Sequence, residues 1–125
     1  MQVGDDCYPI SGSWYSPFDG ATWTDPSDVD IDHMVPLAEA WRTGASHWTQ
    51  AERKAFANDL NSPQLIAVTD DVNQSKGDKG PEDWKPPSQS YWCTYARMWI
   101  GVKYKYDLTT SSNEKAALND MLDRC

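Results

Sequence analysis

The sequence predicts a single α+β domain in which short strands come first and longer helices follow. The segment 64–69, Gln-Leu-Ile-Ala-Val-Thr, is a short apolar run bounded by Pro and Asp, which is typical of a buried strand. The segment 88–104 carries Trp92, Tyr95 and Trp99 at helical spacing, which predicts a long helix with one apolar face. With 125 residues, of which 39% are hydrophobic, the chain can build one modest core.

Three short strands are expected in the N-terminal part of the chain. Two of them, 11–15 and 20–24, flank a Ser-Pro-Phe-Asp-Gly turn. The third begins at Val29, where Val-Asp-Ile-Asp-His alternates in strand fashion until Pro36 interrupts it. The N-terminal part is therefore expected to be rich in strands and turns.

Two helices are expected between the third strand and the buried strand. A short helix at 37–42 should end near Gly44, because glycine commonly follows the last helical residue. Thr49-Gln-Ala-Glu is a capping-box pattern, which predicts the start of a second helix. This second helix should run to about Leu60, with Phe56 and Leu60 on one face.

Helices are also expected after the buried strand. Either Asp70 or Asp71 can cap a short helix that reaches about Lys76. The long helix follows, and Ser112 is predicted to cap a last helix at about 113–124. The expected order is therefore small strands, then a strand–helix–strand–helix centre, then helices.

The composition limits the function classes. The net charge of −8 argues against broad electrostatic capture of nucleic acid, which usually shows as a basic surface. The sequence contains no run of about 18 apolar residues, so no membrane span is expected. Its first residues include neither the basic nor the apolar region of a signal peptide, which we expect to have been removed or trimmed.

The chain has three cysteines, Cys7, Cys93 and Cys125. The last two lie in the C-terminal third, where a disulfide between them could tie the last helix down. Cys7 would then have no partner within the chain, and its partner could lie in an upstream segment. Three reduced thiols are the alternative. A zinc knuckle is not expected because no Cys-x-x-Cys pair exists.

The residue types that can perform chemistry gather around the third strand and the short helix after the buried strand. His33 stands at the strand end, and histidine titrates near neutral pH, so it can take a proton from water. Asp30 and Asp32 are two residues apart and therefore share one strand face. Carboxylate and amide oxygens suit Mg²⁺, which Asp32 and Asn73 could bind together. Lys76, one helical turn after Asn73, could meet a phosphate.

Two segments resemble the two halves of the HNH endonuclease signature, Asp-His-Met-Val-Pro and Asn-Gln-Ser-Lys-Gly-Asp-Lys. They occur in the same order as in that family, with a strand between them. The stretch from residue 30 to the end also resembles the secreted HNH endonucleases of actinobacteria and fungi, which are grouped with the DUF1524 proteins. This wider resemblance includes residues 37–41, 56–60, 63–69 and 93–100.

The resemblance implies an α+β fold with a ββα-metal core of the HNH, or His-Me finger, kind at about 29–80. Short N-terminal strands would precede this core. Additional C-terminal helices at about 88–125 would complete one endonuclease domain spanning 1–125. We expect a secreted, monomeric protein, and the sequence leaves open whether an inhibitor protein exists.

The resemblance also implies a metal-dependent endonuclease that is largely sequence-non-specific. It would hydrolyse phosphodiester bonds of DNA and could also accept RNA. His33 would be the general base, and Asp32 and Asn73 would bind one Mg²⁺, for which Mn²⁺ could substitute. Lys76 would contact the substrate phosphate, and Asp30 and Gln64 would support the site.

Two departures from the HNH pattern affect these assignments. Many members carry a second metal-binding histidine on the helix, and this sequence has none, so Asn73 must serve. Many also carry an asparagine at the start of the second strand, which orients the general base. Gln64 stands at that offset here, and Asn58 or Asn61 could substitute for it.

Two other readings stay open at this point. The chain could be a catalytically silent module that binds nucleic acid or a protein partner, which its acidic charge favours. It could also be a glycan hydrolase using two carboxylates, although no convincing pair stands out. Further cations could extend a phosphate patch, namely Lys79, Lys85, Arg97, Lys103 and Lys105.

Overall fold

The computed structural model describes residues 2–3 and 9–125, so Cys7 lies outside the described residues. The strands are β1 (Gln2–Val3), β2 (Pro9–Ser11), β3 (Trp14–Ser16), β4 (Ala21–Trp23), β5 (Val29–His33) and β6 (Leu65–Thr69). The α-helices are α1 (Leu37–Arg42), α2 (Gln50–Ala57), α3 (Asp70–Lys76), α4 (Trp92–Lys105) and α5 (Ser112–Leu122). Short 3₁₀ helices are η1 (Pro26–Asp28), η2 (Ala45–His47) and η3 (Gln89–Tyr91). The architecture is mixed α+β, and none of the described helices is long and apolar enough to cross a bilayer.

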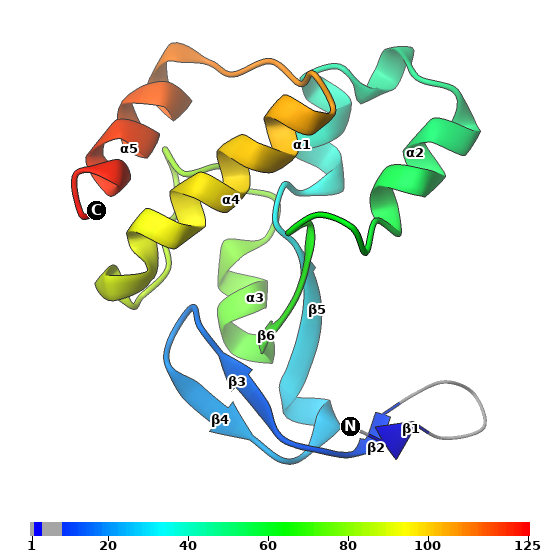
Figure 1. The fold of residues 1–125 in the computed structure, drawn as a ribbon, viewed down its shortest axis with the longest axis vertical. Coiled ribbons are helices and arrows are strands. Elements are labelled where there is room, and N and C mark those ends of the chain that lie inside the picture. Colours follow the sequence, from blue (N-terminus) through cyan, green and yellow to red (C-terminus); the bar gives the residue numbers. More distant parts are fainter. Residues whose placement is uncertain (1, 4–8) are drawn as a thin grey trace.

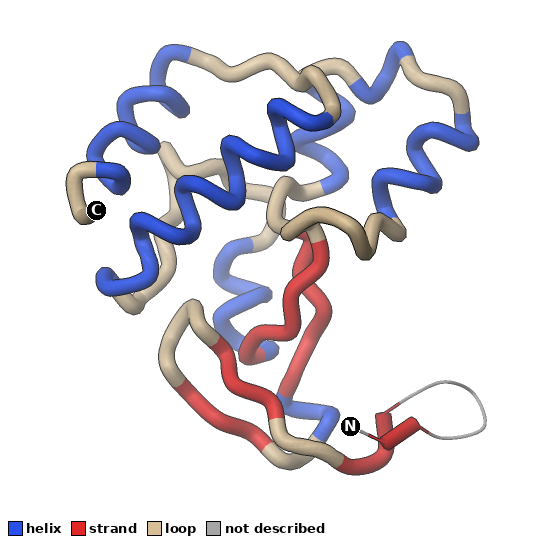
Figure 2. The backbone as a smooth tube through the Cα atoms, in the orientation of Figure 1, coloured by secondary structure: helices blue, strands red, loops and turns tan. Residues whose placement is uncertain are grey.

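At the centre, two antiparallel strands are followed directly by a helix. β5 pairs with β6, with His33 opposite Leu65 and Val29 opposite Thr69. α3 begins at the residue after β6 and lies beside both strands (Figure 1). Helices α1, α2, α4 and α5 lie beyond the end of β5 that leads into α1, and the turn of the β3–β4 hairpin contacts α4 (Figures 1 and 2).

The β3–β4 hairpin is attached to the end of β6. The backbone N–H of Thr69 donates to the Ser16 hydroxyl at 3.0 Å. The indole N–H of Trp23 donates to the Thr69 hydroxyl at 2.8 Å, and that hydroxyl donates to Asp19 at 3.1 Å. These bonds fix where β6 ends and α3 begins.

The core forms mainly around α4, as its aromatic spacing predicts. Tyr95 and Trp99 are fully buried, and Phe18 packs its ring against Tyr95 with centroids 5.4 Å apart. Trp84 also contacts Phe18, with ring centroids 5.8 Å apart. Trp84 is therefore a core side chain rather than an exposed aromatic platform.

The prediction that the second helix runs to Leu60 is wrong. Its capping box at Thr49 is present, but α2 ends at Ala57 and Leu60 is 83% exposed. The Asp59 carboxylate explains the early end, because it accepts hydrogen bonds from Lys105 at 2.8 Å and from the Tyr106 hydroxyl. These contacts tie the chain to the end of α4 instead of continuing the helix.

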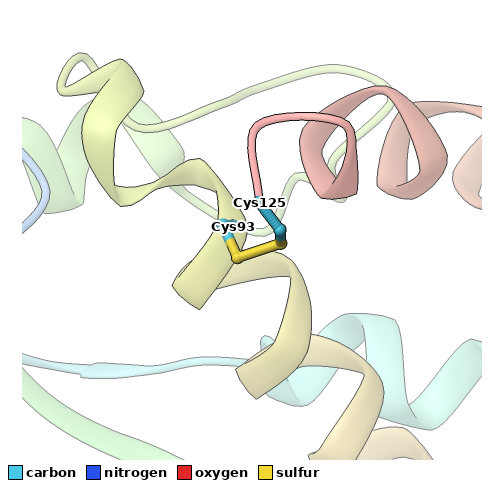
Figure 3. The surroundings of a disulfide bond; sticks show 2 residues. All are labelled: Cys93 and Cys125. Carbon is cyan, nitrogen blue, oxygen red and sulfur yellow. A yellow bond between two sulfur atoms is a disulfide. The ribbon is translucent and has the colours of Figure 1, made fainter.

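The C-terminal helix is fastened at both ends. At its start a capping box forms at Ser111, one residue earlier than the predicted Ser112. At its end a disulfide joins Cys93 to Cys125, with the two Cα atoms 5.2 Å apart (Figure 3). The disulfide that the sequence left open is therefore present, and it ties the last helix to the beginning of α4.

Two of the cations predicted to extend a phosphate patch are paired with carboxylates. The Lys103 side chain is 3% exposed, and its Nζ lies 3.0 Å from Glu39 and 2.9 Å from Glu114. The Nζ of Lys105 lies 2.8 Å from Asp59. Both lysines connect helices and loops, so their charges are largely neutralised within the protein.

Candidate active site

The strand–strand–helix unit brings the two halves of the sequence motif together. Asp30, Asp32 and His33 stand on β5, and Asn73 and Lys76 stand three residues apart on one face of α3. Contacts between β5 and α3 connect Asn73 with Asp30 and Lys76 with Asp32. The polar residues of the motif therefore meet where the strand and the helix lie side by side.

His33 is oriented by a main-chain carbonyl. Its Nε2 lies 2.9 Å from the carbonyl oxygen of Ala57 at the end of α2. Because a carbonyl can only accept a hydrogen bond, Nε2 must carry the proton. In the neutral ring Nδ1 is then an unprotonated acceptor, which is the form that a general base needs.

Gln64 supports the loop after His33 and not the imidazole itself. Its Oε1 accepts from the backbone N–H of Val35 at 3.0 Å, and its Nε2 donates to the Val35 carbonyl at 2.8 Å. Its own backbone carbonyl accepts from the N–H of Met34 at 2.6 Å. Gln64 is fully buried, so these three bonds fix the path of the chain as it leaves β5. The expectation that Gln64, Asn58 or Asn61 orients His33 is therefore corrected, because the Ala57 carbonyl makes that contact.

The structure contradicts the prediction that Lys76 contacts the substrate phosphate. Lys76 is fully buried, and its Nζ donates to Asp32 Oδ2 at 2.6 Å. The same Nζ donates to the carbonyl oxygens of His33 and Met34, each at 2.8 Å. An ammonium group has three donors, and all three are used inside the protein. The helical spacing placed Lys76 on the correct side of α3, but the side chain points inward to the turn after β5.

Asp32 is a buried carboxylate with one oxygen committed to Lys76. It is 5% exposed, and burial raises the pKa of Asp32 above its ordinary value, with Lys76 and His33 opposing the shift. Burial likewise lowers the pKa of Lys76, opposed by Asp32. Among the hydrogen bonds of the described residues, none reaches Asp32 Oδ1. That oxygen is therefore free to bind a cation.

Asp30 orients the side chain of Asn73. The Asn73 Nδ2 donates to Asp30 Oδ2 at 3.2 Å, which leaves the amide oxygen of Asn73 as an available acceptor. A hydrogen bond with Asp70 raises the pKa of Asp30, burial raises it further, and Asn73 opposes the shift. Asp30 therefore contacts Asn73 and positions its side chain.

An open pocket of about 280 Å³ lies over these groups. Asp32, His33 and Asn73 all line it, which brings together the three residues predicted to carry the chemistry. The other lining residues are Ile31, Pro36, Leu37, Ala38, Gly77 and Asp78. Gly77 ends α3 with a φ of 54°, a conformation that favours glycine, and so allows the chain to turn at the pocket rim.

The donor atoms in this pocket fit Mg²⁺ better than a soft metal. No cluster of three or more His, Cys, Asp or Glu side chains that could bind a metal occurs within the described part of the chain. Magnesium needs no such cluster, because it keeps several waters and takes one or two carboxylates plus substrate oxygens. The Oδ1 atoms of Asp32 and Asn73 are of the right chemical kind for it.

Sequence reasoning missed three contributors to the site. The Ala57 carbonyl that orients His33 leaves no trace in the side-chain sequence, because any residue has a carbonyl. Leu37 and Asp78 line the pocket and belong to the segments that carried the family resemblance, so their proximity to the motif was a usable signal.

Comparison with known proteins shows which protein family the chain belongs to. The family model of the C-terminal domain of GmrSD restriction endonucleases matches residues 4–121, so the chain belongs to this nuclease-related family. No solved structure matches the chain.

A particular relative extends the comparison. The chain is 66% identical over 125 residues to a protein of Arthroderma benhamiae named "Uncharacterized secreted protein". The match covers 100% of this chain and 61% of the relative, so the chain spans about three fifths of that curated protein's length.

Proposed function

We propose that this chain is a metal-dependent endonuclease domain of the HNH, or ββα-metal, type. It hydrolyses phosphodiester bonds of DNA, with RNA as a second substrate, and does so largely without sequence specificity. The observation that supports this most directly is the shared pocket of Asp32, His33 and Asn73, with the His33 proton assigned to Nε2. Membership of a restriction-endonuclease family supports a nucleic-acid substrate.

In this proposal the side chains have distinct roles. His33 Nδ1 takes a proton from the attacking water, while the Ala57 carbonyl keeps the ring in the required tautomer and orientation. Asp32 and Asn73 each supply one oxygen to a single Mg²⁺, for which Mn²⁺ can substitute. When bound, the ion stabilises negative charge on the scissile phosphate and on the leaving oxygen. Gln64 and Lys76 hold the turn after His33, so the base and the metal ligands stay in a fixed relation.

We also infer that the protein acts outside the cell. The relative from A. benhamiae is named a secreted protein, and a disulfide such as Cys93–Cys125 persists in oxidising compartments. The chain is then an extracellular nuclease domain.

A catalytically silent binding module is the second candidate. The net charge of −8 and the burial of Lys76 favour it, because both reduce contacts to phosphate. The intact His33, Asp32 and Asn73 favour the enzyme. The two candidates differ in whether phosphodiester bonds are broken.

Cleavage of supercoiled plasmid by the purified protein tests the proposal. We expect nicking in Mg²⁺ and none in EDTA. The His33→Ala variant should be about 100-fold slower or worse, because general-base catalysis contributes roughly that much. Asn73→Ala should need a higher Mg²⁺ concentration. His47→Ala, which changes an exposed residue of η2, is the matched control and should keep full activity.

Two outcomes would contradict the enzyme. Undiminished cleavage by His33→Ala would show that His33 is not the general base, and cleavage in EDTA would show that the reaction needs no metal ion. Binding of nucleic acid by the wild type without any cleavage in Mg²⁺ or Mn²⁺ would support the silent module instead.

A further inference from the structure

We propose that an apolar pocket beside His33, formed by α1 and α2, binds an unpaired nucleobase of the substrate by stacking on Trp41. This inference rests on the proposed function and names the substrate class that the site prefers, namely single-stranded or locally unpaired nucleic acid. The pocket has a volume of about 230 Å³. Its lining residues are Leu37, Ala40, Trp41, Ala45, Arg53, Phe56 and Ala57.

This pocket, called the stacking pocket below, borders the candidate active site. Leu37 lines both of them. Ala57 lines the stacking pocket, and its carbonyl oxygen is the atom that orients His33. A nucleotide with its phosphate at His33 therefore has the stacking pocket next to it, within reach of a neighbouring base.

Trp41 has the properties of a stacking surface. It is 52% exposed although tryptophan is usually largely buried. Its indole N–H makes no hydrogen bond among the described residues, and it stands on the exposed side of α1. The ring therefore keeps much of its π surface for a ligand, whereas Trp84 and Trp99 are used in the core.

Arg53 makes this surface electropositive and rigid. Its guanidinium carbon lies 5.2 Å from the centroid of the Trp41 ring. Its Nη1 donates to the carbonyl of Ala45 at 3.2 Å and to that of Trp48 at 2.5 Å, so the guanidinium is held in place. An arginine stacked on an aromatic ring is a common element of single-strand binding sites, where it contributes cation–π attraction.

The charge distribution explains why stacking is needed. The chain has a net charge of −8, and Lys76 and Lys103 are buried in ion pairs. Phosphate contacts alone would therefore give weak binding that salt weakens further. Base stacking is worth roughly 1–3 kcal/mol per base and is tolerant of sequence, which suits a non-specific nuclease. A base in a duplex already stacks on its neighbours, so only an unpaired base can occupy the pocket.

The test measures binding of a fluorescein-labelled single-stranded oligonucleotide in the His33→Ala background with Mg²⁺. Adding Trp41→Ala should weaken binding about 5- to 150-fold, the range that loss of one stacked base gives. Trp41→Phe, which keeps an aromatic ring, should restore most of the affinity. Tyr104→Ala is the matched control, because Tyr104 is an 88% exposed aromatic on α4 outside both pockets.

A second experiment uses the wild-type enzyme and oligonucleotides in which one base at a time is removed. Loss of the base next to the cleaved bond should raise KM, and this effect should vanish in Trp41→Ala. Equal affinity of Trp41→Ala and the control for single strands would overturn the inference, as would a preference for perfect duplex. If Trp41→Ala is unchanged while the wild type cleaves, only this inference fails. If the wild type binds single strands through Trp41 but never cleaves, only the proposed catalysis fails.

Discussion

The side-chain ammonium of Lys76 lies 2.6 Å from Asp32 Oδ2, and both residues are almost completely removed from solvent. This contact connects α3 to β5 directly at the candidate metal ligand. Because Lys76 also binds the carbonyls of His33 and Met34, one cation organises the carboxylate and the turn beside the proposed base. The lysine is thus a positioning residue whose effect on activity passes through Asp32 and His33.

Replacing Lys76 should destabilise the fold itself. Lys76→Met leaves the Asp32 charge and two carbonyls without their donor, and breaking one side of a buried ion pair costs about 3–5 kcal/mol. Urea unfolding at neutral pH measures the loss. Lys79→Met is the matched control, since exposed Lys79 makes one hydrogen bond to the Ser75 carbonyl and should change stability by less than about 0.5 kcal/mol. If Lys76→Met is as stable as the wild type and only its KM is raised, the lysine contacts substrate instead of stabilising the fold.

Gln64 should affect catalysis through the turn after β5. Gln64→Ala removes both side-chain bonds to Val35 in a fully buried place, which should lower the free energy of unfolding by about 2 kcal/mol. It should also lower kcat more than it raises KM, because His33 loses its fixed position. Gln64→Glu should damage the turn at least as much, because a carboxylate oxygen would replace the Nε2 donor opposite the Val35 carbonyl in a fully buried place. Gln89→Ala, which changes an exposed glutamine on η3, is the control and should leave both stability and kcat unchanged.

Asp30 should influence metal affinity through Asn73. Asp30→Ala frees the Asn73 amide to rotate, and loss of a residue that orients a metal ligand typically weakens metal binding about 10- to 100-fold. The Mg²⁺ concentration that gives half-maximal cleavage should rise accordingly. Asp30→Asn keeps an acceptor oxygen for Asn73 Nδ2 and should restore most of the affinity. Asp71→Ala, an exposed acidic residue on α3, serves as the control, and a similar rise in that variant would attribute the effect to lost surface charge alone.

Asp59 should make the fold sensitive to acid. The hydrogen bond from Lys105, and further ones from Tyr106 and Ser62, hold the pKa of Asp59 well below its ordinary value. A depressed folded-state pKa contributes stability that is complete above the unfolded value of about 4 and declines as the pH falls below it. Asp59→Asn should therefore cost about 1–3 kcal/mol at pH 7 and much less at low pH. Chemical unfolding at several pH values measures this, with exposed Asp120→Asn as the control.

The same contact should respond to alkali in the opposite sense. Burial and the hydrogen bond to Asp59 raise the pKa of Tyr106 from 10.0 to about 12. A raised folded-state pKa contributes stability that is present below the unfolded value and is lost as the pH rises through the folded one. The free energy of unfolding should therefore decline between pH 10 and about pH 12, and Tyr106→Phe should make this decline smaller. If the decline is unchanged in Tyr106→Phe, another titrating group is its cause.

The local sequence determined most of the elements and the identity of the central residues. The apolar run at β6 and the aromatic spacing of α4 correspond to a strand and a helix, because burial of one face follows from periodicity. Asp32, His33 and Asn73 could be nominated from residue type and order alone, and they line one pocket.

Only the tertiary structure decided how the supporting groups are used. Lys76 was predicted to face substrate, but packing of α3 against β5 buries it on Asp32. Gln64 stands at the offset of a residue that orients the general base in the HNH pattern, yet it binds Val35. A main-chain carbonyl that no side-chain pattern reveals orients the imidazole. The physical reason is the same in each case. Sequence spacing specifies which face of a helix or strand a residue occupies, whereas its partner is set by whichever polar group the fold buries beside it.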